Sequence, residues 1–245
     1  MALFHLLMVI CLSPSLTSRL KWAKIANLSI VKPHNWVVKK TQRASYDRIL
    51  IVTEGSKTEP NYFNEIRVAN RLRTANVQVE PSAFGTEPIQ IVEYAESLFL
   101  NGDESKDIQP RAFEEVYVVF DRDDHLTYHN ALAKTDALNL KYQNDNKQKV
   151  VFKSIASVPC FELWLLLHFE QVHAPMHRNA VYERLKTYLP NYEKGDVGHY
   201  TATQMHIEMA NTRALALAQI NDKYDGTQPY TSVQELVKKL SGLNQ

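Results

Sequence analysis

Two short acidic clusters, each directly after an apolar run, are the residues of this chain best suited to chemistry. Glu54 follows the run 48–53, and Asp121-Arg122-Asp123-Asp124 follows the run 115–120. Each run is rich in β-branched residues and predicts a buried strand. Open α/β sheets place their ligands at the carboxyl ends of strands. Carboxylates gathered there repel one another unless a cation lies among them, so the pattern predicts a divalent-metal site and phosphate chemistry.

The loop after the first run offers several groups within six residues. Gly55 lets the backbone turn sharply, and we expect it to leave the Glu54 carboxylate exposed. Lys57 and Glu59, a further candidate metal ligand, lie in this loop and in the first turn of the next helix. Thr58 is the predicted N-cap of that helix, whose N-terminus favours an anion. The loop therefore predicts a metal ligand, a cation and a phosphate-binding helix end, or else a purely structural turn with a capping box.

The second cluster carries two carboxylates two residues apart. If the strand geometry continues, Asp121 and Asp123 point to the same side, where a cation or an arginine would compensate their charge. We predict that they bind a metal, with Asp124 as a further candidate ligand. The alternative is a solvated acidic loop in which Asp124 caps the next helix.

A third segment, 157–169, places Glu162 in the first turn of a very apolar helix at the same predicted edge. Glu162 is a candidate metal ligand, although acidic residues favour a first turn anyway. Cys160 is predicted to be a small buried thiol, because no cysteine, histidine and asparagine arrangement is evident. His168 follows six residues after Glu162, so the two do not share a helix face, and we expect a half-buried histidine.

These segments belong to an alternating pattern of strands and helices. Hydrophobic periodicity predicts strands at 48–53, 76–84, 115–120 and 149–156, and helices at 59–73, 88–100 and 127–142. After residue 160 the predicted elements are all helices, at 160–170, 177–189, 203–223 and 231–241. We predict an α/β fold: a Rossmann-like parallel sheet of about four strands, flanked by helices, with a C-terminal all-helical extension.

The composition is that of a soluble globular protein. The 245 residues are 44% hydrophobic and 22% charged, and the formal net charge is +1. Nucleic-acid binding would therefore need a local basic patch. The two cysteines, Cys11 and Cys160, match no zinc spacing and exclude a disulfide framework.

The first 45 residues differ from the rest, and we expect them to be a poorly ordered extension. Residues 1–12 are apolar but too few to span a bilayer. They resemble a signal-peptide core without its basic n-region, so a misplaced start or a tail is favoured over export. We expect a cytoplasmic protein without stable membrane association. Between Arg19 and Arg48, eight basic residues are opposed only by Asp47, which predicts either an arm that holds a polyanionic backbone or a solvated linker.

Several of these segments together resemble one known family. The runs 49–63, 120–125 and 159–169 are similar to the signatures of the RloB-like family, and 192–194 and 229–237 resemble its closing segments. The resemblance covers about 46–241 in order. It implies an RloB-like domain over 46–245, with a Toprim-like α/β core at 46–158 and a helical part at 159–245.

The resemblance also implies a site and a role. Toprim domains bind Mg²⁺ through a Glu after the first strand and an Asp-x-Asp after a later one, which correspond here to Glu54, Asp121 and Asp123. RloB-like proteins are associated with anti-phage and abortive-infection loci, often beside an ATPase. The chain departs from the family in its apolar residues 1–12 and in Thr53, where the family more often has cysteine.

The leading hypothesis is a Mg²⁺- or Mn²⁺-dependent nuclease that cleaves DNA or RNA. Lys57 or Lys194 would neutralise the phosphate, and Glu54 would bind metal or act as a general acid or base. One alternative is a non-catalytic regulatory or binding subunit of an ATPase-containing complex. Another is a phosphotransfer enzyme, which usually needs an aspartyl nucleophile where Glu54 stands. The substrate, the trigger and the formation of a homo-oligomer are left open.

Overall fold

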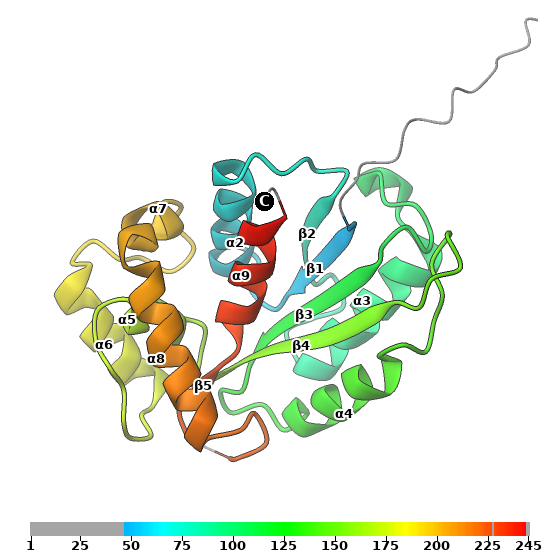
Figure 1. Ribbon diagram of the computed structural model, residues 1–245. Coiled ribbons are helices and arrows are strands. Elements are labelled where there is room, and N and C mark those ends of the chain that lie inside the picture. The colour runs from blue at the N-terminus through cyan, green and yellow to red at the C-terminus, as the bar shows by residue number, and fades with distance from the viewer. Residues whose placement is uncertain (1–46, 227, 244–245) are drawn as a thin grey trace, which may run out of the picture. The chain divides into compact units, whose positions relative to one another are not determined.

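The sheet that the sequence predicts is present. The computed structural model describes residues 47–226 and 228–243, so the apolar segment and most of the basic arm lie outside the described residues. Four strands run parallel in the order β2-β1-β3-β4 (Figure 1). Their bounds are β1 (Ile49–Thr53), β2 (Val77–Pro81), β3 (Glu115–Asp121) and β4 (Val151–Val158). This confirms an α/β fold with a mostly parallel sheet.

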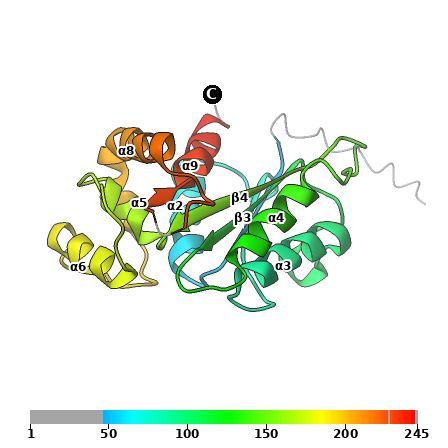
Figure 2. The ribbon, with the colours of Figure 1, turned by 90° about the horizontal axis from the view of Figure 1, so that it is seen from below.

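Helices cover both faces of the sheet because alternate side chains of the strands point to opposite faces. In β1, Leu50 and Val52 pack with helices α3 (Pro88–Asn101) and α4 (Tyr128–Leu138). Ile49 and Ile51 pack on the other face, against α2 (Thr58–Ala69) and the C-terminal helices. Figure 2 shows α3 and α4 on one side of the sheet and α2 on the other. Burial on both faces explains why β1 is apolar at every position up to Thr53.

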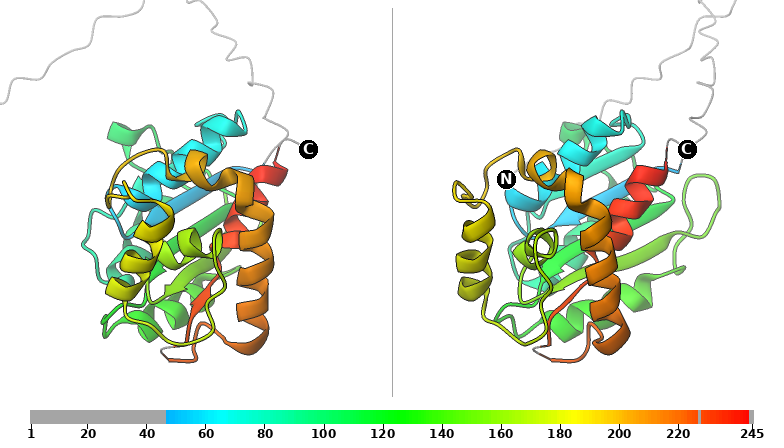
Figure 3. Two further views of the ribbon diagram at one scale, coloured as in Figure 1. Left: turned by 90° about the vertical axis from the view of Figure 1, so that its left-hand side faces the viewer. Right: turned by 60° about the vertical axis from the view of Figure 1, so that its left-hand side comes forward.

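The C-terminal part is mostly helical. It contains α5 (Glu162–Leu167), α6 (Arg178–Tyr188), α7 (His199–Thr203), the 3₁₀ turn η2 (Gln204–His206), α8 (Ile207–Ile220) and α9 (Val233–Gly242). Figure 3 shows α8 and α9 side by side. These helices share one hydrophobic core with α2 and with one face of the sheet. The part of the chain that carries the last signatures is thus packed directly on the strands.

One strand in this part was not predicted. Strand β5 (Tyr230–Thr231) pairs antiparallel with the end of β4, whereas the sequence pattern placed residue 231 in the last helix. Two residues are too few to show alternation, so periodicity has no signal for such a strand. The predicted helix 203–223 is likewise divided into the end of α7, η2 and α8. The predicted loop 101–112 contains a 3₁₀ turn, η1 (Glu104–Lys106).

Two predicted helix caps are wrong. Lys57, and not Thr58, occupies the N-cap position of α2, and it makes no side-chain cap hydrogen bond. Helix α4 begins after Thr127, so Asp124 does not cap it. Thr127 instead donates a hydrogen bond from Oγ1 to Glu87 Oε2 at 2.7 Å. Over the described ranges, no helix combines the length and the apolar character needed to cross a bilayer.

Candidate functional site

The two predicted acidic strand ends lie next to each other. The chain passes from β1 outward to β2 and then returns to place β3 on the other side of β1, so the strand order reverses between β1 and β3. Such a reversal opens a crevice at the carboxyl ends of the two strands. Here the Glu54 amide donates to the Val119 carbonyl at 3.0 Å, and Glu54 Oε2 accepts the Asp121 amide at 2.9 Å. Glu54 and Asp121 therefore lie at the same crevice, as predicted.

Four carboxylates lie close enough at this crevice for the charges of three of them to act on the fourth, Asp121. We call them the carboxylate cluster: Glu54 after β1, Glu59 in the first turn of α2, Asp121 at the end of β3, and Glu162 at the start of α5. Asp121 is 4% exposed, Glu59 4% and Glu162 1%. Burial raises the pKa of Asp121 well above its ordinary value, and the charges of the other three members raise it further. Burial also raises the pKa of Glu59, to about 7.

The expectation that Glu54 is exposed is wrong. Its side chain is 13% exposed, and burial raises its pKa even though the Asp121 amide and His125 favour the charged form. Gly55 has a different role from the one predicted. A Cβ at this position would lie 2.0 Å from Glu59 Oε2, so glycine leaves room for the Glu59 carboxylate; its φ is not in the left-handed region.

The donor set of the carboxylate cluster fits a hard divalent cation. Glu59 Oε2 and Glu162 Oε2 are buried without a hydrogen-bond partner, and buried acceptors are normally satisfied. Oxygen ligands with excess negative charge are those that Mg²⁺ and Mn²⁺ prefer. In the placement described, no group of three or more histidine, cysteine, aspartate or glutamate side chains of residues 47–226 and 228–243 is arranged to hold an ion. Glu54 and Asp123 instead point to partners within the chain.

The partner of Glu54 is His125. Its Nε2 lies 3.2 Å from Glu54 Oε1, and its Nδ1 lies 3.2 Å from Glu87 Oε1. Burial alone would lower the pKa of His125, but the two carboxylates outweigh it and raise the pKa. The imidazole thus bridges the carboxylate cluster to the N-cap residue of α3. This chain of three groups can hold or pass a proton at Glu54 Oε1.

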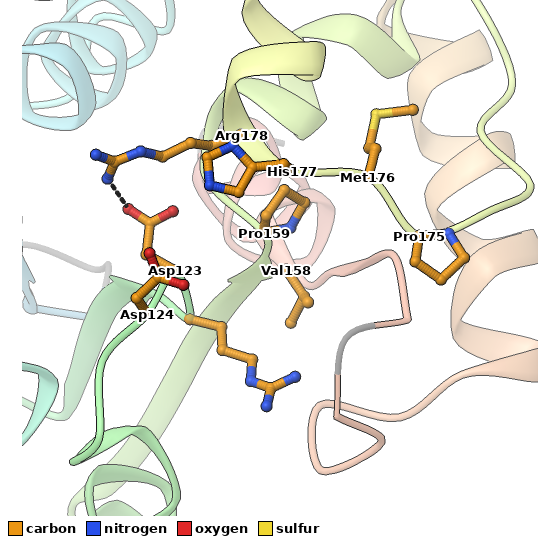
Figure 4. Close-up of a pocket in the computed structure, with 9 residues that line it drawn as sticks. Asp123, Asp124, Val158, Pro159, Pro175, Met176, His177 and Arg178 are labelled. Atoms are coloured by element: carbon orange, nitrogen blue, oxygen red, sulfur yellow. Dashed lines mark hydrogen bonds and ion pairs between the residues drawn. The ribbon is translucent and has the colours of Figure 1, made fainter.

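Asp123 does not continue the strand. Strand β3 ends at Asp121, and Asp123 has a φ of 38°, in the left-handed region. The expectation that Asp121 and Asp123 share one side through strand geometry is therefore wrong. Asp123 Oδ2 instead accepts a hydrogen bond from Arg178 Nη1 at 2.8 Å, which Figure 4 marks with a dashed line. Asp124 is exposed at a neighbouring cavity, apart from the carboxylate cluster.

Both predicted lysines lie beside the cluster. Lys57 and Lys194 line a small cavity of about 190 Å³ together with the loop 55–59 and Gly195. Lys194 Nζ is 3.9 Å from Glu162 Oε1, which also accepts the Tyr192 hydroxyl at 2.8 Å. Burial opposes the charge of Lys194, but Glu162 raises its pKa, so the ammonium stays charged. This arrangement can receive an anionic group next to the carboxylates.

Two further expectations concern α5. Cys160 is buried, as predicted, and burial together with Glu162 raises the pKa of its thiol, so it is a poor nucleophile. His168 is 1% exposed and not half-buried as predicted. Its ring lies against Trp164, with centroids 4.8 Å apart.

Sequence reasoning missed four side chains of this site: His125, Glu87, Arg178 and Tyr192. His125 has a local signal, because it follows the acidic cluster by one residue. Tyr192 also has one, because it lies in the segment 192–194 two residues before the predicted Lys194. Glu87 and Arg178 reach the site only through tertiary packing, and no spacing in the sequence relates them to Glu54 or Asp123.

One of the comparisons with known proteins gives a match. The family model described as "RloB-like protein" matches residues 49–240, which include every member of the carboxylate cluster. Neither the curated proteins nor the solved structures gave a significant match.

Proposed function

The chain belongs to the RloB-like protein family, and we propose that it is a Mg²⁺- or Mn²⁺-dependent nuclease of Toprim type that cleaves phosphodiester bonds of nucleic acid. We further propose that it is the effector of an anti-phage system and acts with a partner ATPase. The observation that carries the proposal is the carboxylate cluster at the reversal of the strand order. Buried carboxylates with two unpartnered oxygens favour a bound cation.

Glu54, Asp121 and Asp123 are the proposed main ligands, and Glu59 and Glu162, each with a buried oxygen that lacks a partner, are further candidate ligands. An ion here would compete with His125 for Glu54 and with Arg178 for Asp123. When bound, such an ion activates water and stabilises charge on the phosphate.

The residues of the chain have separate roles in this proposal. Lys57 and Lys194 orient and neutralise the scissile phosphate from the cavity that they line. His125 holds Glu54 in place and can exchange a proton with Glu54 Oε1, since Glu87 fixes the far side of the ring. Arg178, once released from Asp123, provides a third cation for the nucleic-acid backbone.

The test is cleavage by the purified full chain. Single- and double-stranded DNA and RNA are incubated with Mg²⁺ or Mn²⁺, with and without the ATPase encoded next to the gene. We expect cleavage that Asp121→Ala abolishes and Asp136→Ala leaves unchanged. Asp136 is a matched control because its side chain is 55% exposed on α4, away from the carboxylate cluster. Absence of cleavage in every condition, or equal cleavage by the Asp121→Ala variant, overturns the proposal.

A second candidate is a non-catalytic subunit that binds and regulates the ATPase. The observation in its favour is that His125 and Arg178 pair with Glu54 and Asp123 within the chain. This candidate predicts that Asp123→Ala keeps the effect of the protein on ATP hydrolysis, and that calorimetric titration with Mg²⁺ or Mn²⁺ gives the same weak heat for the variant and the wild type.

A further inference from the structure

A separate cavity of about 290 Å³ adjoins the carboxylate cluster (Figure 4). One part of its wall is aliphatic: Val158 and Pro159 come from the end of β4, and Pro175 and Met176 come from the segment before α6. Its polar groups are Arg122, Asp124, the imidazole of His177 and the ion pair of Asp123 with Arg178. The cavity therefore combines apolar surfaces with both hydrogen-bond donors and an acceptor.

Arg122 provides a donor that nothing in the described residues satisfies. Its guanidinium lies near the ring of Tyr128, with Cζ 6.0 Å from the ring centroid, and its amide donates to the Ser157 carbonyl at 2.8 Å. The Nη1 atom is buried without a hydrogen-bond partner. Buried donors without acceptors are uncommon, so the Arg122 guanidinium keeps unused hydrogen-bonding capacity at the wall of the cavity that it lines.

Asp123 connects this cavity to the proposed phosphodiester site. It lines the cavity, its charge acts on Glu54, and its carboxylate pairs with Arg178 at 2.8 Å. A nucleotide whose phosphate lay at the carboxylate cluster would thus have this cavity beside it. A nucleobase has two apolar faces and an edge of donors and acceptors, which match aliphatic walls, an arginine and a carboxylate.

We propose that this cavity binds one unpaired nucleobase of the substrate strand, next to the phosphate that is cut. Arg122 donates to acceptors on the edge of the base, Asp124 accepts from its amino or imino groups, and Met176 and Pro159 contact its faces. The substrate is therefore single-stranded, or has an unpaired base at the cut, since a base within a duplex cannot enter. This inference rests on the proposed nuclease function and adds the form of its substrate.

The test measures binding in EDTA, so that it does not depend on cleavage. Labelled ten-nucleotide single strands of DNA and of RNA are compared by fluorescence anisotropy with strands of the same length that carry abasic sugars throughout. Both kinds of strand present the same phosphates to Lys57, Lys194 and the basic arm. We expect the full chain to bind the strands with bases at least about tenfold more tightly. Comparing the DNA and RNA pairs identifies which strand supplies the base.

Two pairs of matched variants locate this preference in the cavity. Arg122→Gln and Met176→Asp should each remove most of the preference for bases. Arg184→Gln and Met205→Asp make the same charge changes outside the cavity, at exposed side chains, and should keep it. Met176 lies in a loop but packs, half-buried, against the hydrophobic core. Asp124→Asn, at an exposed side chain of the same cavity, therefore tests the proposal if either cavity variant fails to fold.

The outcomes separate this inference from the nuclease proposal. Equal binding of the two kinds of strand, no binding, or an equal loss of preference in all four variants overturns the nucleobase cavity. If strands with bases bind more tightly but no metal ion gives cleavage, the nucleobase cavity is supported and only the nuclease proposal is overturned. Cleavage of fully paired duplex at the rate of single strands also overturns the cavity.

Discussion

Protonation of His168 should weaken the fold in acid. This residue follows α5 and is 1% exposed. Its Nδ1 lies 2.9 Å from the Trp164 carbonyl, so the neutral ring donates there, and its Nε2 is buried without a partner in the described residues. A second proton on Nε2 would be buried without an acceptor. Burial accordingly lowers the pKa of His168 from 6.5 to about 4.

The direction and size of the effect follow from this shift. Above pH 6.5 the ring is neutral in both the folded and the unfolded chain, and the stability contribution is fully present. As the pH falls from 6.5 to 4, the unfolded chain binds a proton that the folded chain does not bind. The free energy of unfolding therefore falls, by about 3 kcal/mol once the pH is below 4. This is a large share of the stability of a typical domain.

The measurement compares urea unfolding of the wild type and His168→Asn between pH 7.5 and 4. Asparagine keeps a donor near the position of Nδ1 but does not titrate. The variant leaves a cavity and should be less stable than the wild type at pH 7.5, but its free energy of unfolding lacks the His168 contribution to the pH dependence. We expect the two free energies of unfolding to converge by about 3 kcal/mol as the pH falls. His173→Asn, at an exposed histidine, is the control for the same substitution outside the core. A constant difference between the wild type and His168→Asn would refute the argument.

Three other variants test the site itself. Arg178→Gln removes a cation that competes with metal, so the affinity for Mn²⁺ measured by calorimetry should rise several-fold while binding of nucleic acid weakens. Gly55→Ala should displace the Glu59 carboxylate, because its Oε2 would lie 2.0 Å from the added Cβ. The affinity for Mn²⁺ should then fall by tenfold or more, while the free energy of unfolding measured by heating falls by less than about 1 kcal/mol. Tyr192→Phe deprives buried Glu162 of its 2.8 Å hydrogen bond and should cost about 1–3 kcal/mol of unfolding free energy in urea.

The neighbouring positions of Glu54 and Asp121 could be predicted from the sequence because two local rules determine them. A β-branched apolar run identifies each strand, and strands alternating with helices form a parallel sheet whose carboxyl ends share one edge. Glu59 and Glu162 followed from the same reasoning, since each lies in the first turn of a helix that starts at that edge. These predictions need only the order of the elements.

Asp123 and its partner could not be predicted in this way. The left-handed conformation of Asp123, with a φ of 38°, breaks the strand periodicity on which the prediction relied. Arg178 begins a helix 55 residues later, and its meeting with Asp123 depends on how the segment before α6 crosses the end of β4. Sequence spacing does not contain that information. The burial of His168 was missed for a similar reason, because helices of the C-terminal part cover it.

The helical part after residue 158 belongs to the site as much as the sheet does. The sheet and α2 provide Glu54, Glu59 and Asp121, three carboxylates that burial disfavours as charges. Two of the nearby cations, Lys194 and Arg178, come from the helical part, which also adds Glu162. Because the same helices complete the hydrophobic core on one face of the sheet, folding and charge compensation are coupled. Changes that loosen the helical part from the sheet should therefore alter the carboxylate cluster before they unfold the strands.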